Sequence, residues 1–334
     1  MEDTLKKYTK HKKSIVDIEW DKYLQLNPDL VKANITTPQK VFTHWFNYGI
    51  REVRNYSDNN MEAISEWDKI SNYLRNNYYI AKSWAFIVTT CVRSETHLSY
   101  LKECIKHIRK LYPNTHIYVI NDNSSLDINV IKDDEIEIIE AIAPKAGELN
   151  PYLFGMDERC KHDKLVYIHD TVFIKKKIDI YIVRNTEIDF LWYDITAIHN
   201  DTVRPENAEI LNNLRFYFGN GKISAYRYLS MVKDMRIPFS VKFGSMSIFT
   251  KSFCEKLDLV TNIKEASKYF KQRVHRCFLE RLLSLFHIFI YGNDYLLRNH
   301  LCGNIQRHLN SFKNLNINGI IDRKQPFVKV WQGR

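Results

Sequence analysis

The residues best suited to chemistry in this 334-residue chain surround one carboxylate, Asp170, which lies two positions after the largely apolar segment 164–168. Such a segment is typical of a buried strand, so Asp170 is expected at the strand's carboxyl end. Its oxygens are suitable ligands for Mg²⁺ or Mn²⁺. The neighbouring His169 could assist such a site or simply cap the strand. Because this turn contains only one carboxylate, His300 or His308 from the C-terminal segment could complete the site.

Polar segments also follow the other predicted strands. In an open α/β sheet, ligands bind beyond the carboxyl ends of the strands, where a packed core would not need polar side chains. This rule brings segments 89–94, 121–125, 144–150 and 169–171 to one edge of the sheet. We therefore expect a shared site at that edge.

Three charged residues of these segments have candidate roles. Asp122 could accept hydrogen bonds from a uracil or a ribose, but Asn, Asp and Ser also close strands unaided by forming Asx turns. Glu148 could contact sugar hydroxyls, or it could cap the helix that begins there. Arg93 could clamp a diphosphate, because a guanidinium matches the geometry of phosphate oxygens.

A fourth charged candidate, Glu280, lies in the helical segment RVHRCFLERLLS. Its spacing from Arg276 is that of two neighbours on one helical face, which predicts a structural ion pair. The alternative is a general base for an acceptor hydroxyl, which requires the carboxylate within hydrogen-bond reach of that oxygen.

An alternating pattern of strands and helices would position these side chains. We predict strands at 85–90, 115–120, 135–141 and 164–168, with helices at 98–111 and 147–160 between them. Such alternation implies βαβ units and a mostly parallel sheet. Further on, we predict a strand at 189–193, helices at 208–218 and 226–234, a strand or loop at 241–249, mostly helix at 263–290, and an extended edge segment at 326–331.

The domain organisation follows from changes in composition. Residues 1–14 are charged and expected to be flexible, and 15–57 form a small helical module in which the Asn27-Pro28-Asp29 turn ends one helix and can cap the next. Residues 58–82 are expected to be a helical connector, and 83–334 the α/β domain. The module is too short to hold a core by itself.

Composition restricts the class of protein. The chain is 45% hydrophobic, as expected of a globular protein. Its six scattered cysteines contain no CxxC pair, and no signal peptide or membrane-spanning run is recognisable. The net charge of +10 suits an anionic partner, although the lysines and arginines are spread out. Nucleotide-binding, hydrolase and metalloprotease motifs such as GxGxxG, GxSxG and HExxH do not occur.

Several phrases carry a resemblance to a known family. The order strand, helix, strand-Asp, strand, helix, strand-Asp resembles the GT-A nucleotide-diphospho-sugar transferase fold, with a mixed, mostly parallel sheet flanked by helices. KAGELNPYLFG, KLVYIHDTVFI, FGSMSIFTKSF, RVHRCFLERLL and KVWQGR are similar to glycosyltransferase-like proteins of giant DNA viruses, over residues 84–334. EWDKYLQLNPDL and HWFNYGIREVR resemble a short helical module found beside glycosyltransferase domains.

The resemblance implies a glycosyltransferase that uses a UDP- or GDP-sugar donor, assisted by Mn²⁺ or Mg²⁺, and a glycan or protein acceptor. It points to Asp122 for the nucleotide, Asp170 for the metal or diphosphate, and Glu280 as the candidate base. We therefore expect Asp170 and Glu280 to be catalytic, and the metal to be held by Asp170 with His308. The residues expected to bind the donor are Thr89, Thr90, Arg93, Asn121, Asp122, Glu148 and His169. An inactive binding or virion-associated protein on the same scaffold is the alternative, since the usual second carboxylate near Asp170 is missing. We expect no nucleic-acid partner, no transmembrane segment, and a location in host cytoplasm or virion.

Overall fold

The computed structural model describes residues 20–37, 40–41, 44, 81–179, 182–183, 187–194, 205–218, 221–224, 241–291, 301–305 and 326–330. Segment 1–14, nearly all of the predicted connector, the predicted helix at 226–234, His300 and His308 lie outside these residues.

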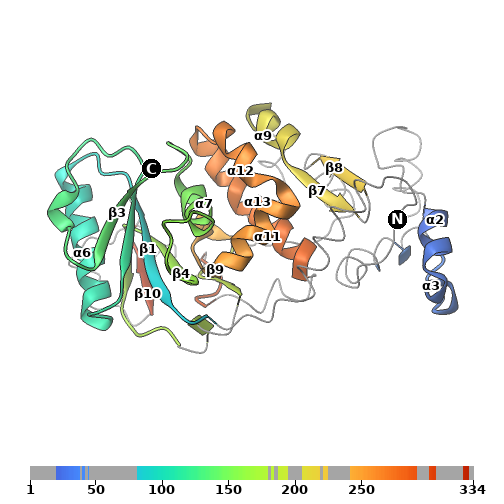
Figure 1. Ribbon diagram of the computed structural model, residues 1–334, viewed down its shortest axis with the longest axis horizontal. Coiled ribbons are helices and arrows are strands. Elements are labelled where there is room, and N and C mark those ends of the chain that lie inside the picture. The colour runs from blue at the N-terminus through green and yellow to red at the C-terminus, as the bar shows by residue number, and fades with distance from the viewer. Residues whose placement is uncertain are drawn as a thin grey trace.

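The centre of the fold is a six-stranded sheet with the strand order β3-β2-β1-β4-β9-β6 (Figure 1). Its strands are β1 (Trp84–Thr90), β2 (Ile117–Asn121), β3 (Ile136–Glu140), β4 (Lys164–His169), β6 (Ile188–Phe190) and β9 (Ser247–Thr250). Strands β1 to β4 pair in parallel, whereas β9 runs antiparallel to both β4 and β6. The predicted α/β class, with a mixed and mostly parallel sheet, is therefore confirmed.

Burial explains why β1 is central. The side chains from Ala85 to Val88 are inaccessible to solvent, as expected for a strand that is covered on both faces. The carboxyl ends of β1, β2 and β4 consequently lie next to one another at one edge of the sheet. This edge is where the sequence predicted the site.

Helices flank the sheet. In Figure 1, α6 (Glu95–Leu111) lies on one side of the strands, and α7 (Asn150–Gly155), α11 (Lys251–Thr261) and α13 (Arg273–Tyr291) lie on the other. Ser94 caps α6 by accepting a hydrogen bond from the His97 amide at 3.3 Å. Within the described residues, none of the helices has the length and apolar character needed to span a bilayer.

Two helix predictions need correction. The helix expected at 208–218 ends early: α9 (Ala208–Asn213) is followed by β7 (Arg215–Phe218), which pairs antiparallel with β8 (Gly221–Ser224). The asparagines at the end of α9 are weak helix formers, which favours an end of the helix there. The aromatic residues of β7 favour a strand, and pairing with β8 stabilises that strand. The helix expected at 147–160 is the 3₁₀ turn η3 (Gly147–Leu149) followed by α7, and turns occupy the remainder.

The predicted extended segment near the C-terminus is confirmed as β10 (Phe327–Lys329). It pairs antiparallel with β5 (Val172–Ile174), which directly follows the turn that contains Asp170. The Val330 amide also donates a hydrogen bond to the Thr171 carbonyl at 2.9 Å. A segment more than 150 positions away in sequence therefore fixes this turn.

The described part of the N-terminal module contains α2 (Trp20–Leu26) and α3 (Pro28–Lys32). The break at Asn27 is confirmed, but its side chain does not cap α3. Instead, Asn27 Nδ2 donates to the Tyr23 carbonyl at 2.8 Å.

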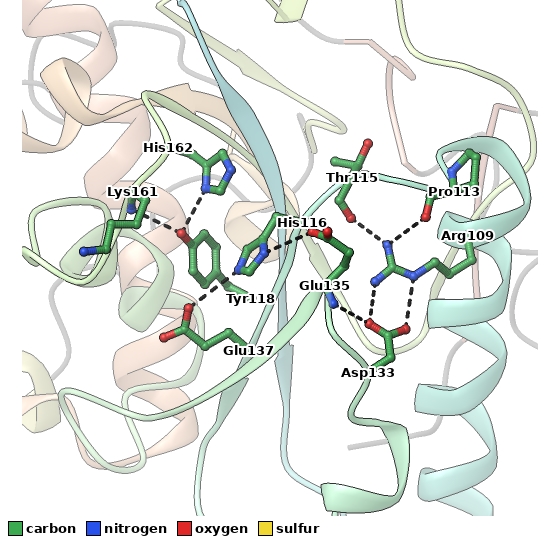
Figure 2. Close-up of polar contacts among 10 residues, drawn as sticks. All are labelled: Arg109, Pro113, Thr115, His116, Tyr118, Asp133, Glu135, Glu137, Lys161 and His162. Carbon is green, nitrogen blue, oxygen red and sulfur yellow. Dashed lines mark hydrogen bonds and ion pairs between the residues drawn. The ribbon is translucent and has the colours of Figure 1, made fainter.

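A second polar group of residues lies at the opposite, amino ends of the strands (Figure 2). We call it the amino-end cluster, and it contains Arg109, His116, Tyr118, Asp133, Glu135, Glu137 and His162. The Tyr118 hydroxyl is hydrogen-bonded to His162 Nδ1 at 2.9 Å and accepts from the Lys161 amide at 3.1 Å. Arg109 Nη2 lies 3.0 Å from Asp133 Oδ1. These pairs connect β2 and β3 to α6 and to the loop before β4.

Candidate active site

A cleft opens at the carboxyl ends of the parallel strands, and five parts of the chain line it. The strand ends supply Thr89, Thr90, Cys91, Asp122, His169, Asp170 and Thr171. The other lining residues are Gly147 and Glu148 of η3, Phe243 and Gly244 of η5 (Phe243–Ser245), Arg273, Arg276, Cys277 and Glu280 of α13, and Lys329 and Val330 at β10.

Most of the predicted site residues meet in this cleft. Thr89, Thr90, Asp122, Glu148, His169, Asp170 and Glu280 all line it. Arg93 and Asn121 are not among its lining residues, and Arg93 is exposed on the surface. Asn121 Oδ1 accepts a hydrogen bond from the Ser124 amide at 3.0 Å, so Asn121 closes the turn after β2. The position of His308 is outside the described residues.

Asp122 holds the loop that carries Glu148. Its two carboxylate oxygens accept hydrogen bonds from the amides of Lys145, at 2.6 Å, and Gly147, at 2.9 Å. Gly147 adopts a positive φ of 52°, and a Cβ there would lie 2.5 Å from Arg276 Cδ. Glycine therefore allows Arg276 to pack directly against this loop.

Asp170 is nearly buried, with 5% of its surface exposed. Thr90 Oγ1 donates a hydrogen bond to its Oδ2 at 2.7 Å, and the Asp170 amide donates to the Thr89 carbonyl at 3.1 Å. Strands β1 and β4 thus orient this carboxylate together. In the part of the chain that the structure describes, no three His, Cys, Asp or Glu side chains are grouped so that they could hold a metal ion.

His169 bridges two distant segments in addition to ending its strand. Its Nδ1 is 3.2 Å from Lys329 Nζ, and its Nε2 is 3.0 Å from the Gly244 carbonyl and 2.9 Å from the Tyr167 hydroxyl. His169 therefore does more than cap its strand, which was one of the two predicted roles.

Glu280 faces the cleft from α13. The Gly244 amide donates a hydrogen bond to its Oε1 at 2.7 Å. Burial raises the pKa of Glu280 to about 8, and the negative charge of Glu148 contributes to this rise. A carboxyl with this pKa is largely protonated at neutral pH, and its conjugate base is stronger than an ordinary glutamate.

The predicted ion pair between Glu280 and Arg276 is wrong. Arg276 Nε lies 3.7 Å from Glu148 Oε2 instead, because this side of α13 packs against η3. That distance is an ion pair without a hydrogen bond, and Glu148 Oε2 is buried with no hydrogen-bond partner among the described residues.

Three cations of the cleft, Arg273, Arg276 and Lys329, were not among the predicted site residues. Arg273 and Arg276 could have been found, because they precede Glu280 by seven and four positions and so share its helical face. Lys329 gave no local signal, since only the pairing of β10 with β5 brings it to His169.

No model of a known protein family matches the chain, and no curated protein matches it. Solved structures do match. S. aureus TarS 1–349 is 10% identical with a TM-score of 0.33, over 60% of this chain and 56% of that one. The mannosyltransferase Ktr4p from S. cerevisiae is 11% identical with a TM-score of 0.34, over 71% of this chain and 80% of that one. The galactosyltransferase LgtC is 11% identical with a TM-score of 0.27, over 53% of this chain and 71% of that one.

Two of these structural neighbours, Ktr4p and LgtC, are thus sugar transferases, and two were solved with nucleotides: TarS 1–349 with UDP and Ktr4p with GDP. The match spans slightly more than half of TarS 1–349 and 34% of the longer TarS structure.

Proposed function

We propose that this protein is a glycosyltransferase that transfers a sugar from a nucleotide-sugar donor to a hydroxyl acceptor. The observation that carries the proposal is the convergence of Asp122, Glu148, Asp170 and Glu280 on one cleft at the carboxyl ends of the parallel strands. These four residues come from separate parts of the chain, and ligands of open α/β sheets bind at this edge.

The donor would occupy the cleft with its diphosphate near the cations. Arg273 and Arg276 line the cleft from α13, so positive charge is available to the donor there. Guanidinium groups bind phosphate oxygens in a fork geometry. These contacts would stabilise the nucleoside diphosphate as it leaves.

A divalent cation at Asp170 remains a prediction. Mg²⁺ in nucleotide sites is often held by one or two carboxylates together with substrate phosphates and water, and Asp170 supplies one such carboxylate. Asp122 is already occupied by two backbone amides, so a second protein ligand would have to come from elsewhere, such as the predicted His308. When bound, Mn²⁺ or Mg²⁺ would neutralise charge on the leaving diphosphate.

Glu280 would act as the general base. In its ionised form it would take the proton of the acceptor hydroxyl as that oxygen forms a bond to the anomeric carbon. The bond between the anomeric carbon and the phosphate oxygen would break, and the nucleoside diphosphate would carry away the electron pair. The raised pKa of Glu280 implies that turnover increases with pH up to about 8.

Donor turnover tests this proposal. The wild-type protein and Asp170→Ala would be incubated with UDP- and GDP-sugars, with and without Mn²⁺, and nucleoside diphosphate release would be measured. We expect release by the wild type and a large loss in Asp170→Ala, both measured at a temperature where the variant is folded. A folded wild-type protein without release would instead support the inactive scaffold. Membership of the giant-virus family, a glycan or protein acceptor, and a location in host cytoplasm or virion also remain predictions.

A further inference from the structure

Three consecutive hydrogen bonds connect the C-terminal strand to the candidate base. The first joins Lys329 Nζ to His169 Nδ1 at 3.2 Å, and the second joins His169 Nε2 to the Gly244 carbonyl at 3.0 Å. The third runs from the Gly244 amide to Glu280 Oε1 at 2.7 Å. The series passes through strands β10 and β4, the turn η5 and helix α13.

The direction of each hydrogen bond follows from the chemistry of the groups. A lysine ammonium can only donate, so His169 Nδ1 must accept from Lys329. The neutral imidazole then carries its proton on Nε2, which can donate to the Gly244 carbonyl or to the Tyr167 hydroxyl. Gly244 accepts through the carbonyl of the peptide that follows it and donates through the amide of the peptide that precedes it, so the residue links the histidine to the carboxyl group.

The backbone at Gly244 is suited to this role. Its φ is +64°, and a Cβ there would lie 2.7 Å from Met246 Cε and 3.3 Å from His169 Cε1. Only glycine permits both the left-handed conformation and the close approach of the imidazole. The position of the Gly244 backbone is therefore sensitive to where the His169 ring lies.

The C-terminal strand is itself firmly placed. Lys329 is 9% exposed, and its neighbour Val330 is 2% exposed and bonded to the Thr171 carbonyl. The Lys329 ammonium also lies 5.7 Å from the centre of the Phe243 ring, in the same turn as Gly244. Strand β10 therefore contacts both the Asp170 turn and η5.

We propose that Lys329 is a positioning residue, which acts through His169 and the backbone of Gly244 to hold the Glu280 carboxyl at the cleft. The C-terminal strand is then part of the catalytic machinery, although it contributes no group to the reaction itself. The consequence for catalysis rests on the role proposed for Glu280, whereas the physical link between the residues does not.

Nuclear magnetic resonance tests the link without any substrate. The Gly244 amide proton signal would be followed with pH in the wild type, where it should titrate with Glu280, whose pKa is about 8. In Lys329→Met, we expect a changed Gly244 shift and a titration midpoint moved upward, since the positive charge of Lys329 lowers the pKa of Glu280. Lys329→Arg should stay close to the wild type. Lys176→Met, which removes an exposed lysine after β5, is the matched control and should match the wild type.

A second variant guards against loss of folding. Lys329→Met with His169→Phe removes both partners of the first contact together, so no imidazole is left without its lysine, while the Gly244 carbonyl and the Tyr167 hydroxyl lose their bond to the ring. An unchanged Gly244 signal in either folded variant would overturn the proposal.

Turnover measurements test the consequence. If Glu280 is the base, Lys329→Met should lower kcat by roughly 10²-fold with little change in KM, because a displaced catalytic group affects the reaction step. An unaltered kcat in Lys329→Met, beside a loss in Glu280→Gln, would also overturn it. A wild type without turnover would contradict the proposed function alone, and the Gly244 signal would still decide whether the link exists.

Discussion

The two ends of the central sheet carry polar groups of very different character. In the amino-end cluster, opposite charges and complementary donors are paired: Arg109 with Asp133, and Tyr118 with His162 (Figure 2). In the cleft at the carboxyl ends, the negative charge of Glu148 contributes to the raised pKa of Glu280. Buried polar atoms without a hydrogen-bond partner among the described residues occur at both ends, at His116 Nε2 and at Glu148 Oε2.

This difference separates groups that hold the fold from groups that are available to a ligand. Pairing at the amino ends satisfies the Tyr118 hydroxyl and the Arg109 guanidinium where loops and a helix meet the sheet, and this contributes to stability. In the cleft, burial and like charge leave Glu280 with a pKa of about 8, which costs stability whenever the group ionises. Sites that perform chemistry commonly contain such perturbed groups.

The largest expected effect comes from Glu280→Gln. Glutamine keeps an oxygen that can accept from the Gly244 amide, but it cannot take a proton. We expect donor turnover to fall by about 10²–10⁴-fold, with thermal stability maintained or increased. Steady-state assays across pH would measure this. Turnover close to the wild type would mean that the perturbed carboxyl of the cleft is not the base.

The second prediction concerns stability and pH. The pKa of Glu280 is about 8 in the folded protein and 4.5 without its environment, so the folded state binds more protons between these values. The free energy of unfolding therefore decreases as pH rises through this window, on the order of 1.4 kcal/mol per unit of pKa shift. Urea unfolding at several pH values would give the free energies of unfolding of the wild type and of Glu280→Gln. The contributions of the other titratable groups cancel in the difference between the two proteins. Parallel curves for the two proteins would contradict the account.

At the amino end, Tyr118→Phe should act on stability alone. It removes the hydroxyl that is bonded to His162 Nδ1 and to the Lys161 amide. We expect a loss of about 1–2 kcal/mol in the free energy of unfolding, because the partly buried His162 ring and the Lys161 amide lose a hydrogen-bond partner. Donor turnover below the unfolding temperature should remain unchanged. A loss of turnover without a loss of stability would mean that Tyr118 serves the reaction and not the fold, which contradicts the role assigned to the amino-end cluster.

The smallest effect is expected for Asp133→Asn. Half of the Asp133 side chain is exposed, and its ion pair with Arg109 is accessible to water and salt. The free energy of unfolding should change by at most about 1 kcal/mol, and less at high ionic strength. Chemical denaturation at two salt concentrations would show this, and a larger, salt-independent effect would identify a more important contact.

The sheet and its functional edge could be predicted from sequence because both depend on local signals. Continuous apolar runs such as residues 85–88 identify buried strands, and Asp122 and Asp170 each directly follow a strand. Parallel pairing then brings these carboxylates to one edge. The cleft residues that follow from this rule were predicted correctly in position, while their roles stay predictions.

The remaining features depend on contacts between distant segments. The spacing of Arg276 and Glu280 suggested an ion pair, but packing of α13 on η3 pairs Arg276 with Glu148. The contact between Lys329 and His169 exists only because β10 pairs with β5. The periodicity of a single sequence does not predict such partners, because each contact depends on how distant segments pack in the fold.

Calorimetric titration of the wild-type protein with UDP- and GDP-sugars, with and without Mn²⁺, tests the central claim most directly. The account predicts saturable binding of at least one donor, weakened in Arg276→Ala, which removes a cation from the cleft, and unchanged in Tyr118→Phe at the other end of the sheet. A folded protein that binds none of these donors would contradict the assignment of the cleft as a nucleotide-sugar site.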